Sequence, residues 1–124
     1  MKSDLTQSRL VRVLMVFCAI AAIVAIAGRV NYYVDRNRRA ATVTQGNELV
    51  SAINAYHTRE GSFPTELERA VIGSIPPPTW GARAWGYQSD GEYFCLWVYS
   101  GDRLTPHYPM LIFDSRLGRW SFDE

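Results

Sequence analysis

A run of fifteen residues at positions 13–27 (VLMVFCAIAAIVAIA) carries no polar side chain. Leu10, Val11 and Gly28 lengthen this run to nineteen residues if Arg12 bends its guanidinium back to the interface, as long cationic side chains do. The hydrocarbon core of a bilayer takes about 20 helical residues. The sequence therefore predicts a transmembrane helix over residues 10–29, whose apolar side chains include Val13, Leu14, Val16, Phe17, Ile20, Ile23, Val24 and Ala27.

The same run has the length of the apolar region of a cleaved signal peptide. Lys2, Arg9 and Arg12 supply the positive residues that precede such a region, and Ala25-Ile26-Ala27 has the small-residue pattern of a cleavage site. Cleavage after Ala27 is therefore the alternative to a retained anchor. A buried helix of a soluble protein fits less well, because the run has no polar stripe.

Basic residues flank the run on both sides: Lys2, Arg9 and Arg12 before it, and Arg29, Arg36, Arg38 and Arg39 after it. A count of three against four does not orient the span by the positive-inside rule. Arg29, Tyr32 and Tyr33 follow the run directly, as interfacial anchors do.

Residues 30–58 are expected to continue the helix, because Pro64 is the first proline and Gly46 the only glycine between Gly28 and Gly61. Leu49, Ile53 and Tyr56 recur at i, i+4 and i+7 and predict an apolar face that packs on a partner. Gly61 is placed to end this helix. A short helix is expected to start at Pro64, with Ser62 or Thr65 as its cap, and to close at Gly73.

The rest of the chain has the pattern of four short strands. Strands are predicted at residues 85–88, 92–100, 110–114 and 119–122, with turns at 89–91 and 115–118. The predicted fold class is α+β, a long N-terminal helix (transmembrane, then amphipathic) packed on a four-stranded antiparallel sheet. The predicted organisation is a short N-terminus (1–9), a transmembrane helix (10–29), its continuation (30–58) and a head (59–124).

Several motifs beyond the apolar run resemble a known family. The helix end Ala52-Ile53-Asn54-Ala55-Tyr56 is followed by four residues and then by Gly61-Ser62-Phe63-Pro64-Thr65-Glu66-Leu67. Trp85-x-Tyr87, Asp90-Gly91-x-Tyr93 and Gly118-x-Trp120 lie downstream. This pattern is similar to type IV pilin-like proteins, especially the major pseudopilins of type II secretion, and the likeness covers residues 40–122.

The resemblance implies a pilin-like fold and a structural role in a secretion or pilus-like apparatus. It assigns structural roles to Tyr56, Gly61, Phe63, Pro64, Leu67, Trp85 and Tyr87. It also implies a single-pass protein of the bacterial inner membrane with residues 1–9 in the cytoplasm and the head in the periplasm. The chain departs from the family in having no glycine before Gly28 and no glutamate in residues 13–27, so no prepilin cleavage motif is recognisable.

The sequence nominates no catalytic centre and no cofactor. His57 and His107 are fifty residues apart, and Cys95 is the only plausible third ligand of a zinc site. Some pseudopilins hold calcium near the C-terminus, but the acids available here are scattered and form no D-x-D-x-D run: Asp90, Glu92, Asp102, Asp114, Asp123 and Glu124. We expect a protein that is not an enzyme, with calcium as the one metal to test.

Aromatic residues crowd into positions 80–122. They are expected to fill the small core of the head, and an exposed aromatic face of the sheet is the alternative. A net charge of +1 gives no field that attracts nucleic acid. The expected partners are the lipid bilayer and other proteins that contact the N-terminal helix, including further copies of this chain. The alternative function is an exported binding module that uses the aromatic sheet face after cleavage at Ala27.

Overall fold

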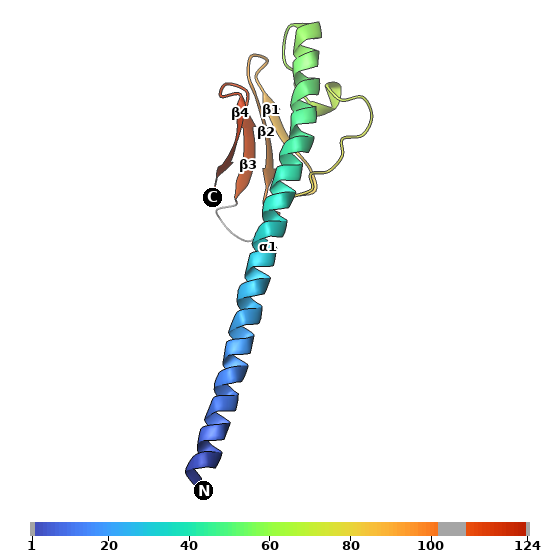
Figure 1. The fold of residues 1–124 in the computed structure, drawn as a ribbon. Coiled ribbons are helices and arrows are strands. Elements are labelled where there is room, and N and C mark those ends of the chain that lie inside the picture. The colour runs from blue at the N-terminus through green and yellow to red at the C-terminus, as the bar shows by residue number, and fades with distance from the viewer. Residues whose placement is uncertain (1, 102–108, 124) are drawn as a thin grey trace. The chain divides into compact units, whose positions relative to one another are not determined.

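The computed structural model of the chain describes residues 2–101 and 109–123 (Figure 1). The helix α1 covers Lys2–Glu60 and is followed by a short 3₁₀ helix, η1 (Leu67–Arg69). The strands are β1 (Gly86–Ser89), β2 (Phe94–Tyr99), β3 (Met110–Asp114) and β4 (Arg119–Asp123). The chain divides into two compact units, Met1–Arg36 and Asn37–Glu124, and each unit is described by itself.

The first unit consists of the N-terminal part of α1. Its apolar side chains are exposed throughout, as Phe17 at 67% and Ile20 at 53% illustrate. α1 is long and apolar enough to cross a membrane, and no residue in its most apolar stretch is buried. Cys18 is a free, exposed cysteine within the run.

The second unit is a helix packed on a sheet. The strands pair in the order β1-β2-β3-β4, and every neighbouring pair is antiparallel. Figure 1 shows the green and teal part of α1 along one face of this sheet. The predicted combination of a long N-terminal helix and a four-stranded antiparallel sheet is therefore confirmed.

The core lies between α1 and the inner face of the sheet. Leu49 and Ile53 of α1 are buried, as the i, i+4 spacing predicts, and they cluster with apolar side chains of η1, β2 and β3: Leu67, Phe94, Leu96 and Phe113. A second cluster joins Trp80, Val98 and Leu111. Inward residues alternate with outward ones along β2 and β3, as the twofold period of a strand requires.

Gly46 allows a close approach between α1 and the sheet. A β-carbon at this position would collide with the indole ring of Trp120, whose Nε1 donates a hydrogen bond to Asn47 Oδ1 at 2.8 Å. The one glycine between Gly28 and Gly61 is therefore a packing position.

The predicted end of the helix is confirmed. α1 ends at Glu60, and Gly61 has a φ of +83°, a backbone conformation that favours glycine. The Gly61 N–H donates to the carbonyl oxygen of His57 at 2.8 Å.

Two local predictions are wrong in extent. The helix expected from Pro64 is only the one-turn η1, whose cap position is Glu66 rather than Ser62 or Thr65 and has no side-chain cap. Leu67 is the buried residue of η1, and without a side-chain cap the first turn lacks a contact that would favour a longer helix. The second strand starts at Phe94 rather than at 92, because Asp90 Oδ1 accepts the N–H groups of Glu92 and Tyr93 and extends the turn.

Candidate functional site

The eight predicted transmembrane residues all have exposed side chains in the first unit. Such exposure is costly in water, since burial of one large aliphatic side chain is worth about 1.5–3 kcal/mol. A helix with apolar side chains over its whole surface is typical of a membrane span. This segment is the first candidate site, and its chemistry is suited to lipid or to another apolar helix.

The second candidate site lies where the chain leaves α1. The ring of Phe63 lies against His57 at a tilt of 32°, with centroids 4.3 Å apart, and contacts Phe94 edge-on at 4.9 Å. The Phe63 N–H also donates to the carbonyl oxygen of Gly91 at 3.0 Å. These contacts attach the loop after Gly61 both to the end of α1 and to the β1–β2 turn.

Tyr87 completes this attachment. Its hydroxyl donates to the carbonyl oxygen of the buried Pro64 at 2.7 Å. Burial raises the pKa of the Tyr87 phenol above its ordinary value, although a hydrogen bond with Ser89 acts in the opposite direction. The phenol therefore stays protonated and remains a donor near neutral pH.

Four of the seven residues of the family motif lie close together in the structure. Phe63, Pro64, Leu67 and Tyr87 converge between α1 and β1, and Trp85 donates from Nε1 to the Pro76 carbonyl oxygen at 3.0 Å. Tyr56 is half-buried on the last turns of α1, where the guanidinium of Arg59 lies 5.5 Å from its ring. The sequence motif therefore marks a real junction, held by Tyr87 and Trp85 as well as by the aromatic-proline pair.

Polar contacts between α1 and residues 77–80 were not predicted from the sequence. Thr42 is fully buried, and its hydroxyl accepts the Trp80 N–H and donates to the Arg38 carbonyl oxygen, both at 2.9 Å. Gln45 Oε1 accepts from the N–H and the hydroxyl of Thr79 at 2.9 Å. The sequence signal available for these contacts was the i, i+3 spacing of Thr42 and Gln45 next to the apolar face of the helix.

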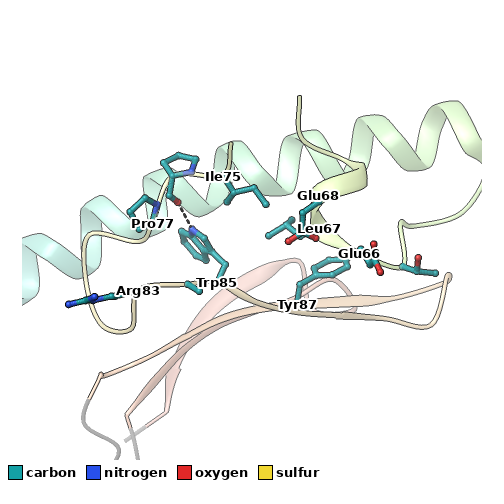
Figure 2. A pocket seen from close by; sticks show the side chains of 11 residues that line it. Glu66, Leu67, Glu68, Ile75, Pro77, Arg83, Trp85 and Tyr87 are labelled. Atoms are coloured by element: carbon teal, nitrogen blue, oxygen red, sulfur yellow. Dashed lines mark hydrogen bonds between the residues drawn. The ribbon is translucent and has the colours of Figure 1, made fainter. Parts of the chain in front are cut away.

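A cleft of about 410 Å³ opens beside this junction (Figure 2). Its apolar lining includes Leu67, Ile75 and Trp85, while Glu66 and Glu68 lie at one end and Arg83 at the other. The polar groups of its two aromatic side chains already have partners, because Trp85 Nε1 donates to the Pro76 carbonyl oxygen and the Tyr87 hydroxyl donates to that of Pro64. The cleft has room for a small apolar or cationic group. Sequence reasoning missed it because its walls come from three separate segments.

A smaller hollow lies at the β1–β2 and β3–β4 turns and is lined by Cys95, Asp90 and Arg116, among others. The pKa of Cys95 is raised, first by burial and then by the nearby Asp114, so this free thiol is protonated at neutral pH. Asp114 has a lowered pKa because Arg116 donates to it, with Nη2 to Oδ2 at 2.8 Å.

Within residues 2–101 and 109–123, no group of three His, Cys, Asp or Glu side chains could hold a metal ion. Asp102, His107 and Glu124 lie outside the described residues, so their part in the calcium and zinc hypotheses has no structural outcome.

Comparisons with known proteins add no relative. No family model, no curated protein and no solved structure matches the chain. The likeness to pilins rests on the sequence motifs alone, and the fold is established at the level of one long helix and a four-stranded antiparallel sheet.

Proposed function

We propose that this chain is a membrane-anchored, pilin-like structural protein, a component or relative of a type II secretion or type IV pilus-like apparatus. One observation carries the proposal: α1 includes both the exposed apolar residues 13–27 and the buried core residues Leu49 and Ile53. The same helix thus supplies a segment suited to lipid and the framework of a folded head. In this proposal the head lies in the periplasm and residues 1–9 in the cytoplasm.

The proposed structural role depends on contacts between the membrane-spanning segments of neighbouring chains. In a bilayer, helices associate through close packing of side chains, because lipid is as apolar as the helix surface. We therefore propose that copies of this chain, or related chains, meet through residues 13–27.

A cysteine scan of the anchor tests this role. Single cysteines at positions 16–24, in a full-length C18A/C95A background, are oxidised in membranes. The proposal predicts disulfide-linked dimers at positions that recur every three to four residues, since these share a helix face. A cysteine at Ile72, which is fully exposed in the head, measures random collision. Uniform crosslinking at the level of this control would contradict the proposal.

The alternative is an exported binding module. The outer face of the sheet carries the half-buried Trp97 and Met110 and the exposed Tyr99, and β2 and β3 pair so that Tyr99 lies opposite Met110. Cleavage after Ala27 would release a chain that begins at Gly28 and presents this face. Recovery of a soluble mature chain with that N-terminus would favour the alternative.

A further inference from the structure

One face of α1 just beyond the apolar run combines positive charge with aromatic rings. Arg29, Tyr32, Tyr33 and Arg36 lie at i, i+3, i+4 and i+7, which places them on one side of a helix. All four side chains are exposed, and the two tyrosine rings meet edge-on with centroids 5.8 Å apart. All four belong to the first unit, so the face is complete within it.

The charge of this face is uncompensated. Within the described part of the chain, neither Arg29 nor Arg36 makes an ion pair or a hydrogen bond through its guanidinium. Asp35 is the only acidic residue between Asp4 and Glu48. It is half-buried, has interactions of its own, and lies about 100° around the helix from Arg36.

The face lies at the depth of lipid headgroups if residues 10–28 span the bilayer. At about 1.5 Å per residue, Arg29 lies directly after Gly28 and Arg36 about 12 Å beyond it. Side chains on a helix tilt toward its N-terminus, so both arginines lean back toward the span. The polar layer of each leaflet is roughly 5–7 Å thick, and a long arginine side chain bridges the remaining distance. Tyrosine is enriched at the same depth.

We propose that Arg29, Tyr32, Tyr33 and Arg36 form a binding face for the phosphate groups of anionic phospholipids and collect these lipids around the C-terminal end of the anchor. The inference rests on the proposed membrane anchoring and names the lipid class that the anchor selects. Arginine presents a planar array of donors that matches a phosphate, and the tyrosine hydroxyls add donors at the same level. Each basic residue near a negatively charged membrane surface increases binding by up to about fivefold.

The test uses the full-length chain reconstituted in vesicles. A fluorophore is attached to A27C in the C18A/C95A background, and nitroxide-labelled phosphatidylglycerol or phosphatidylcholine is titrated as the quencher. We expect phosphatidylglycerol to quench several-fold more strongly at equal fraction. R29Q/R36Q should reduce that ratio to about one, and R29K/R36K should keep most of it, because both lysines retain the charge.

The controls separate the possible failures. R59Q/R69Q removes two exposed arginines of the head and should leave the ratio unchanged. Equal quenching by both lipids in the parent protein would overturn the inference but not the membrane anchoring. A preference for phosphatidylglycerol that survives R29Q/R36Q would do the same. Absence of quenching by either lipid would overturn the anchoring as well. Loss of the preference in inorganic phosphate, but not in chloride of equal ionic strength, would assign the site to free phosphate and overturn its assignment to lipid.

Discussion

Thr42 shows how one buried polar side chain fixes the position of a segment far away in sequence. Its hydroxyl satisfies the Trp80 N–H and is itself completely enclosed. T42V keeps nearly the same shape but removes the acceptor, and loss of a hydrogen bond to a buried group costs about 1–3 kcal/mol. T42S keeps the hydroxyl and loses one methyl group, which is worth about 0.8 kcal/mol. Denaturation followed by tryptophan fluorescence should rank the parent above T42S and T42S above T42V, and the reverse order of the two variants would contradict this role.

Gly46 tests the close approach of α1 and the sheet. A methyl group there collides with Trp120, whose indole is held by Asn47 and by contact with Phe113 at a centroid distance of 5.4 Å. Overpacking costs about 1–3 kcal/mol, which exceeds the roughly 0.5–1 kcal/mol by which alanine favours a helix over glycine. G46A should therefore lower the unfolding free energy of the head. G28A is the matched control, because nothing lies within 4 Å of its β-carbon, and equal effects of the two substitutions would refute the packing argument.

At the scale of elements, the turns of the sheet are stabilised by carboxylates. Backbone N–H groups of Tyr93 and Glu92 lower the pKa of Asp90, and the Arg116 side chain does the same for Asp114. A folded-state pKa below the ordinary value of 3.8 means that this stabilisation is present above about pH 4 and is lost as the pH falls through the lower folded pKa. Asp90 is exposed, and the half-buried Asp114 pairs with the exposed Arg116, so solvent screens both interactions and the effect is small.

Urea unfolding of the full chain in detergent between pH 6 and pH 2 measures this contribution. The midpoint of the parent protein should fall in acid. D114N should start lower near neutrality and fall less, because it lacks the group that must be protonated. D123N, at the exposed end of β4, is the matched control. A slope that D114N leaves unchanged would show that the Asp114–Arg116 pair does not contribute.

Most elements could be predicted from the sequence, because their signals are local. The apolar run, Gly61 and the short apolar stretch 110–113 mark one helix, its end and one strand. The contacts that define the second candidate site could not be predicted in this way. The Tyr87–Pro64 bond, the Trp85–Pro76 bond and the cleft between them join residues whose proximity depends on tertiary packing, and hydrophobic periodicity carries no information about such polar contacts.

At the scale of the whole molecule, the two parts of α1 require different surroundings. Residues 13–27 expose apolar side chains that water does not favour, while Leu49 and Ile53 are buried against the sheet. The proposed function accounts for both, since it assigns the first environment to lipid and the second to the folded head. The lipid-binding face is a separate proposal, and it can be wrong even if residues 13–27 anchor the chain in the membrane.

Carbonate extraction of membranes that carry the full-length chain, with the mass of the recovered polypeptide, tests the central claim most directly. The account predicts that the chain stays in the membrane pellet and keeps residues 13–27. Recovery of the chain in the supernatant, with a mass that corresponds to a start at Gly28, would contradict it.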